Sequence, residues 1–473
     1  MTALIWFREF DLRLFDHAPV HHALLKKGDV ACVFVWDDDV ENPYRSLGAA
    51  SKWWLHHSLT SLQKDIESRG GKLIILRGKT DTVLKNLVGE LQVREIFFHK
   101  GYDPRSQFIE KNVERSIKGC LFHGFEGQIL FTPNTIMTKE GKPFSVFTPF
   151  WKCCMTQLDE VLHSTLYPLP IAFPLSDKTR SIPSLPLLSL SLYDGPIDWA
   201  KDFSSHWAVG EKNAHQRLND FIERSLRHYH EKRDYPVEDA TSKMSPHLRF
   251  GEISARTIFK KIKRVVALDA TLARGAECFL REIGWREFSY HLLHRYPDLA
   301  TKPLRPVFEK MPWEDNPSFL ASWKKGKTGY PIVDAGMRQL WKTGWMHNRV
   351  RMIVASFLIK DLFIDWRVGE SWFWDTLVDA DPASNPASWQ WVAGCGADAA
   401  PYFRIFNPML QSQKFDETGH YIRTFVPELH ALTPSSIHDP WKSALPQSFI
   451  YPRPVVKHDL CRKKALKIYE SLK

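Results

Sequence analysis

The sequence predicts two domains, an α/β N-terminal domain built on a doubly wound parallel sheet and a large all-α C-terminal domain. Three observations lead to this fold class. The chain has 473 residues, more than one ordinary hydrophobic core accommodates. Its first ~135 residues alternate short apolar, β-rich runs with amphipathic stretches. From about Asn213 onward the spacing of apolar residues is helical, with few strand signals.

The N-terminal elements follow from this alternation. Strands are predicted over 4–7, 31–36, 72–76 and 95–99, and helices between them over 49–69 and 82–91. Strands that alternate with helices form a parallel sheet with helices on both faces.

A linker follows the α/β part of the chain. Residues 166–196 are rich in Pro, Ser and Leu, and proline is disfavoured inside helices and sheets. We therefore predict a surface segment here. The expected division is an α/β domain over 1–135, an interdomain linker over 136–205 and a helical domain over 206–473.

Composition limits the classes of function. The formal net charge is +10 and the sequence pI is about 9.1, with 18 Trp and 30 Phe. A basic, aromatic-rich chain is suited to nucleic acid, although charge alone does not establish this.

Seven scattered cysteines without a C-x-x-C pair predict reduced thiols and no metal site. The N-terminus lacks a signal sequence and no apolar run is membrane-spanning, so we expect a cytoplasmic protein without a membrane partner.

Two nucleotide-binding patterns are rejected. Residues 326–328 read G-K-T, but Ala321 stands where a P-loop needs glycine. Residues 394–399 fit a glycine-rich dinucleotide pattern but lie in the helical half and follow no strand.

Several motifs resemble one family. Residues 6–13 read W-F-R-E-F-D-L-R, and 52–55 read K-W-W-L. The longest matches, in the C-terminal half, are 282–288, 329–338, 344–352, 365–367, 379–381, 389–391 and 399–408. Together they resemble the cryptochrome/photolyase family, and within it a class I or class III enzyme acting on cyclobutane pyrimidine dimers. The resemblance implies a C-terminal FAD-binding domain and light-driven repair of DNA by electron transfer from excited reduced FAD.

The resemblance also assigns redox residues. Trp389, Trp366 and Trp313 match the family's electron-transfer chain, from the flavin to the surface. A single tryptophan is more often core packing, but all three positions are filled. Asn385 matches the residue that faces flavin N5, where an amide accepts a hydrogen bond without adding charge. The neighbouring Pro386 departs from the class I pattern.

Other positions match the flavin-binding set. Residues 241–245 supply hydroxyls and backbone N–H groups near a helix start, which suits phosphate or an ordinary helix cap. An Arg351–Asp379 pair is expected, and it serves a structural role equally well. The expected cofactor-binding residues are Tyr229, Thr241, Ser242, Lys243, Met244, Ser245, Arg351, Asp379, Ala380, Asp381 and Asn385.

A dimer must leave the DNA stack before it reacts, so the pocket needs aromatic walls and polar contacts. Trp285 and Trp391 match the walls, and Glu282 and Asn348 match the hydrogen-bonding groups; Glu282 is otherwise an ordinary helix-surface carboxylate. The expected DNA-binding residues are Arg233, Glu282, Trp285, Arg286, Asn348, Arg349, Arg351, Met352 and Trp391, and the expected catalytic set is Trp313, Trp366, Trp389, Asn385 and Glu282.

The resemblance further implies an antenna chromophore in the N-terminal domain, a folate such as 5,10-methenyltetrahydrofolate or a deazaflavin. The partner is DNA containing pyrimidine dimers, and a monomer is expected. Three alternatives stay open: a cryptochrome photoreceptor, a (6-4) photolyase and a basic DNA-binding protein without catalysis. Asn385 argues against the first, and the pair His347-Asn348, where (6-4) enzymes have two histidines, argues against the second.

Overall fold

A computed structural model describes residues 2–39, 42–192, 199–399, 403–442 and 450–472. The chain forms two compact units. The first comprises Met1–Pro196, Trp207–Arg227 and Ser242–Pro297; the second comprises Ile197–His206, His228–Thr241 and Asp298–Lys473. The boundaries expected from the sequence, at 135/136 and 205/206, stay a prediction.

The first unit contains the predicted doubly wound sheet. Its five parallel strands run in the order β3-β2-β1-β4-β5 and span Thr2–Phe7, Asp29–Trp36, Leu73–Arg77, Glu95–His99 and Leu121–Phe125 in chain order. Strands β1, β2 and β4 are almost wholly buried, as expected for strands covered on both faces. The predicted fold class is confirmed.

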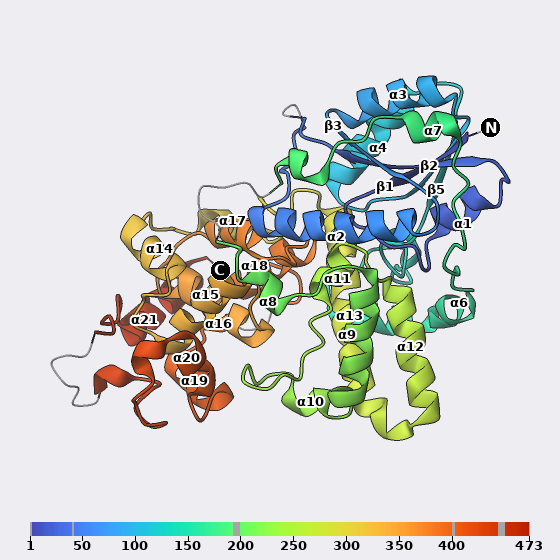
Figure 1. Ribbon diagram of the computed structural model, residues 1–473. Helices are drawn as coiled ribbons and strands as arrows, with labels where there is room; N and C mark the ends of the chain where they lie inside the picture. Colours follow the sequence, from blue (N-terminus) through green and yellow to red (C-terminus); the bar gives the residue numbers. More distant parts are fainter. Residues whose placement is uncertain (1, 40–41, 193–198, 400–402, 443–449, 473) are drawn as a thin grey trace. The chain divides into compact units, whose positions relative to one another are not determined.

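Helices cover both faces of this sheet (Figure 1). Apolar residues of α3 and α4 pack on one face, against side chains of all three central strands. The chain runs from β1 toward β3 and then back toward β5, so right-handed crossovers place α1 and α2 on the other face. These helices span Ala18–Leu24, Ala49–Glu67, Thr80–Leu91 and Pro104–Ser116.

The segment predicted as a linker follows the edge of the sheet. Leu185 N donates to Ile75 O of β3 (2.9 Å), and Phe173 N donates to Arg69 O (2.9 Å). These bonds tie the segment to β3 and to the end of α2; its role as a linker stays a prediction, and 193–196 lie outside the described residues. The other helices of this unit are α5 Phe147–Thr156, α6 Leu158–His163, α7 Asp177–Ser181, α9 Glu211–Arg224, α11 Ser245–Arg249, α12 Ala255–Leu268 and α13 Ala273–Arg295.

Among the described residues of the second unit, every regular element is a helix. Its helices begin and end at clear signals: Asp365 caps α17, and Gly344 and Gly394 end α15 and α18 in the left-handed conformation. None of the described helices combines the length and apolarity that a membrane span needs. The helices are α8 Phe203–His206, α10 Tyr229–Lys232, α14 Pro317–Lys324, α15 Pro331–Thr343, α16 Asn348–Lys360, α17 Trp366–Thr376, α18 Ser384–Ala393, α19 Pro408–Phe415, α20 His420–Phe425 and α21 His458–Ser471.

Candidate functional site

The turn between α17 and α18 carries a group of buried polar residues. Asp379, Asp381 and Asn385 are each 7–8% exposed, and Ala380 between the two aspartates is buried. Asp381 Oδ1 accepts hydrogen bonds from Ala383 N (2.9 Å) and Ser384 N (2.7 Å), which fixes the start of α18. We call this group, Asp379, Asp381 and Asn385, the polar corner.

Asn385 is held in one orientation by Glu370 of α17. Its Nδ2 donates to Glu370 O (3.1 Å) and to Glu370 Oε1 (2.9 Å). Both partners are acceptors, so the amide nitrogen must face them. Oδ1 makes no hydrogen bond within the described residues, so an acceptor remains for an outside donor. Flavin N5–H is such a donor, and the corner therefore fits the expected cofactor.

The expected pairing of Arg351 with Asp379 is present. Arg351 Nη2 lies 2.8 and 3.1 Å from the two carboxylate oxygens, and Nε donates to Met346 O (2.7 Å). The pair joins α16 to the polar corner. The role of Arg351 in binding flavin or DNA stays a prediction.

The three predicted redox tryptophans lie on neighbouring parts of the second unit. Trp389 in α18 and Trp366 at the start of α17 are 2% and 1% exposed, and Trp313 is half-buried ahead of α14. Trp389 packs edge-on against Phe373 of α17 (5.0 Å) and Trp323 (6.3 Å). Trp313, the outermost member of the predicted chain, is the most exposed of the three, as a path that ends at the surface requires.

The predicted phosphate loop divides between the units. Tyr229 and Thr241 belong to the second, and Ser242, Lys243, Met244 and Ser245 belong to the first. Ser242 Oγ accepts from Met244 N (3.4 Å), and Lys243 has a left-handed φ of 51°. Met244, the N-cap residue of α11, makes no side-chain capping bond, but the Ser242 hydroxyl accepts a hydrogen bond from its backbone N–H beside the helix start, so the capping alternative for these hydroxyls stays open.

One face of α13 carries three predicted DNA contacts. Glu282, Trp285 and Arg286 are half-buried and lie three and four positions apart, hence on one side of the helix. Trp285 stacks on Phe147 with ring centroids 3.8 Å apart and planes 9° apart. Arg286 donates to Gln128 O (2.9 Å) and pairs with Glu287, so its guanidinium already has partners in its own unit.

The N-terminal turn of α16 carries the other predicted DNA contacts. Asn348 is exposed, and Arg349 and Met352 are half-buried. Arg349 pairs with Asp234 at 2.8 Å, a residue that sequence reasoning missed, as it missed Glu370. The remaining members are half-buried: Arg233, whose guanidinium lies 5.5 Å from the Tyr229 ring, and Trp391, 5.7 Å from the guanidinium of Arg404. Of motif 399–408, residues 400–402 lie outside the described residues.

The first unit has a cavity of about 390 Å³ beside the carboxyl ends of β2 and β3. Ligands of open α/β sheets bind at this end of the strands. Its lining includes Trp36, Lys52, Arg77 and Arg105. The arginines are engaged: Arg77 Nε donates to Asp38 (2.6 Å), and Arg105 Nη2 donates to the carbonyl of Asp37 (2.7 Å).

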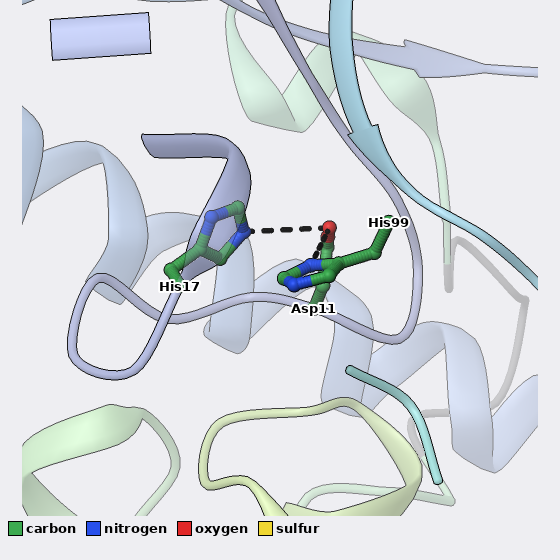
Figure 2. Close-up of side chains that lie close together, drawn as sticks. All are labelled: Asp11, His17 and His99. Carbon is green, nitrogen blue, oxygen red and sulfur yellow. Dashed lines mark hydrogen bonds and ion pairs between the residues drawn. The ribbon is translucent and has the colours of Figure 1, made fainter. Parts of the chain in front are cut away.

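A second polar cluster of the first unit is fully buried. Asp11, His17 and His99 are each at most 1% exposed, and both imidazoles point at one carboxylate (Figure 2). His99 Nδ1 lies 3.0 Å and His17 Nε2 3.4 Å from Asp11 Oδ2. Burial opposes the Asp11 charge, but the two imidazoles outweigh it and lower the pKa of Asp11. Burial lowers the pKa of His99 to about 3.

These three side chains have the donor set of a transition-metal site. However, His17 Nδ1 accepts a hydrogen bond from Val20 N (3.2 Å). In the neutral ring, Nε2 must then carry the proton and cannot offer a lone pair; it lies 3.4 Å from Asp11 Oδ2 without hydrogen-bond geometry. The geometry is that of a hydrogen-bond network joining the loop after β1 to the end of β4, and it lends no support to a metal.

Two family models match separate parts of the chain. Residues 3–170 match the family model described as DNA photolyase, and residues 279–471 match the FAD binding domain of DNA photolyase. A deoxyribodipyrimidine photo-lyase from Agrobacterium fabrum is 44% identical, over 99% of this chain and 98% of the relative. Cryptochrome-2 of Arabidopsis thaliana is 35% identical, over 93% of this chain and 73% of the relative.

The fold agrees with these matches. The crystal structure of a bacterial class III photolyase from Agrobacterium tumefaciens superimposes with a TM-score of 0.91 at 42% identity, covering 100% of this chain and 97% of that chain. Identity at this level over nearly the full length, together with the two family models, shows that the chain belongs to the cryptochrome/photolyase family.

Proposed function

We propose that this protein is a deoxyribodipyrimidine photo-lyase, which repairs cyclobutane pyrimidine dimers in DNA with light and bound FAD. The names of its relatives support this activity. We include in the proposal that it acts as a monomer in the cytoplasm.

The observation that carries the proposal is the fixed amide of Asn385. Glu370 holds its Nδ2, so an uncharged acceptor remains in a buried corner. An acceptor without charge tolerates an anionic reduced flavin, whereas a carboxylate at the same place repels it. Reduced FAD, when bound at this corner, would supply light-driven electron transfer. The chain's task is to hold the reduced state and to position the dimer.

Two sets of residues serve the second task. On α13, Trp285 offers an aromatic face that Phe147 already orients, and Glu282 lies one turn earlier. On the other unit, Asn348 is exposed at the start of α16. We assign Trp285 and Glu282 of the first unit to the extruded dimer; contacts of Asn348 and Trp391, which belong to the second unit, with the dimer are what the family resemblance implies.

The test is a repair assay. The purified protein is expected to show flavin absorption and, once reduced, to remove a single thymine dimer from an oligonucleotide only under illumination. A (6-4) photoproduct in the same sequence should remain intact. A bound flavin without loss of the dimer would favour the cryptochrome alternative. Loss of the (6-4) photoproduct would favour a (6-4) photolyase. Absence of flavin would favour the basic DNA-binding protein without catalysis.

For the antenna, we propose that the cavity at β2 and β3 holds a planar chromophore without a phosphate group. Trp36 provides an aromatic surface, and Lys52 provides a charge 6.0 Å from its ring. The nearby helix starts are taken by carboxylates: Asp37 accepts from Thr80 N of α3 (3.1 Å), and Asp103 accepts from Ser106 N of α4 (2.9 Å). Phosphates prefer unoccupied helix N-termini, so a folate or a deazaflavin fits this cavity better than a flavin nucleotide.

The antenna proposal predicts a second chromophore in the absorption spectrum of the purified protein. Trp36→Ala is expected to remove it while the flavin absorption stays. Retention of the second chromophore by this variant would place the antenna elsewhere.

A further inference from the structure

A carboxylate lies between Arg349 and Arg233, two of the arginines that the family resemblance assigns to DNA. Asp234 Oδ2 is 2.8 Å from Arg349 Nη2, and Oδ1 is 3.9 Å from Arg233 Nε. Asp234 is 37% exposed and Arg349 is 20% exposed. The group is therefore reachable from solvent and by a DNA backbone.

Arg349 is held on its remaining sides. Its guanidinium lies 4.5 Å from the centre of the Phe415 ring, and Nη1 is 3.8 Å from Met352 Sδ. Nε is buried and has no hydrogen-bond partner within the described residues. Since Phe415 and Met352 fix the plane of the guanidinium, the edge that carries Nη2 is the one available to an anion.

Asp234 occupies this edge as a phosphate would. Arginine binds carboxylates and phosphates with the same donors, so a DNA phosphate that contacts Nη2 must displace or share the position of Asp234. Partly exposed ion pairs are weak in water, so this exchange is accessible during binding.

We propose that Asp234 is a built-in competitor of DNA phosphate, which lowers the affinity of the protein for any DNA backbone and speeds its release. This inference rests on the proposed function, because it concerns the DNA-binding face of the repair enzyme. It acts on damaged and undamaged DNA alike, since the contact carries no base information.

The test compares Asp234→Asn with the wild type on two duplexes, one undamaged and one with a single thymine dimer. The variant is expected to bind both more tightly, by a similar factor. Its log–log salt slope should steepen by up to about 0.9, the value for one further phosphate contact. Accordingly, the gain in affinity should shrink by roughly 3.5-fold between 50 and 200 mM salt.

Glu470→Gln is the matched control. Glu470 is an exposed carboxylate of α21, and its replacement changes the net charge equally without touching either arginine. If Glu470→Gln gained as much affinity for DNA as Asp234→Asn, the change in net charge alone would explain the effect, and the proposal would be overturned. A double variant with Arg349→Ala should lose most of the gain.

The remaining outcomes are distinct. Unchanged or weaker binding by Asp234→Asn, with a native melting curve, shows that Asp234 is inert or orients Arg349 for DNA, and overturns the proposal while the repair function stands. A wild type that binds neither duplex and repairs no dimer overturns both.

Discussion

At the scale of single residues, the site depends on partners that lie far away in the sequence. Asn385 is oriented by Glu370, fifteen positions earlier on another helix, and Arg349 pairs with Asp234 on a separate segment. Motif resemblance predicts roles for Asn385 and Arg349 but gives no indication of either partner. An isolated acidic residue carries no signal of its own, and only the packing of α17 against α18 shows what Glu370 contacts.

The Asn385–Glu370 contact predicts the outcome of Asn385→Asp. The new carboxylate would lie within hydrogen-bonding distance of Glu370 Oε1, where the amide now donates at 2.9 Å. Two adjacent buried carboxylates cannot both ionise, so one pKa must rise. We expect weaker dimer cleavage and a light-induced flavin spectrum that changes with pH, unlike that of the wild type. A one-unit shift corresponds to about 1.36 kcal/mol.

Glu370→Gln is the partner experiment. It keeps an acceptor oxygen for Asn385 and removes one charge, so it should not introduce the pH dependence. If Asn385→Asp kept the wild-type spectrum and cleavage, Oδ1 would not face the flavin.

At the scale of elements, α17 and α18 act as one packed pair. Trp389 of α18 lies directly over Gly369 of α17, where any side chain would meet its ring. Strands and long helices with strong apolar patterns were predicted well, as β1, β2, β4 and α2 show. α1, β5 and α4 were missed: α1 is only 7 residues long, β5 is a short half-buried run interrupted by His123 and Gly124, and α4 is strongly polar.

Trp366→Phe tests the role of this helix pair in electron supply. Phenylalanine preserves most of the packing but is far harder to oxidise than indole. We expect light-driven reduction of oxidised FAD to fail, while repair by chemically pre-reduced protein remains near the wild-type level. Photoreduction at the wild-type rate would mean that electrons travel by other aromatic residues.

Gly369→Ala tests the packing itself. The added methyl group would collide with the Trp389 ring and lie 2.6 Å from Leu358 Cδ2. Overpacking of this kind costs about 1–3 kcal/mol, measurable by denaturant unfolding. Gly89→Ala in α3 is the control, since its methyl group meets nothing within 4 Å and should stabilise the helix by ~0.5–1 kcal/mol. Equal effects of the two variants would contradict tight packing at Gly369.

At the scale of the whole molecule, two buried groups whose pKa values are shifted in opposite directions make opposite contributions to the pH dependence of the free energy of unfolding. Burial lowers the pKa of His99 to about 3 and raises that of Glu287 to about 7. Below pH 6.5 the unfolded chain protonates His99 and the native chain does not, so stability falls as pH falls. For Glu287 the native form stays protonated up to about pH 7, so stability falls as pH rises above about 4.5.

This balance predicts opposite changes in two variants. His99→Asn keeps a donor to Asp11 and removes the loss of stability that His99 causes on acidification. Between pH 6.5 and 4, the free energy of unfolding of this variant should therefore fall less steeply than that of the wild type, by ~1.4 kcal/mol per pH unit. Glu287→Gln keeps acceptors for Leu130 N and Phe131 N and should change the slope in the other direction. Parallel pH profiles of both variants and the wild type would contradict the assigned protonation states.

The segment that runs along β3 has a consequence for the physical state of the protein. Leu185 N and the hydroxyl of Ser184 bond to the backbone of Ile75, so the outer edge of the apolar strand Leu73–Arg77 already has a partner. Uncovered edges of such strands recruit strands from other molecules and begin aggregation. The proline-rich segment therefore also covers the edge of the sheet, and we expect a proteolytic cut near residue 184 to expose this edge and promote self-association.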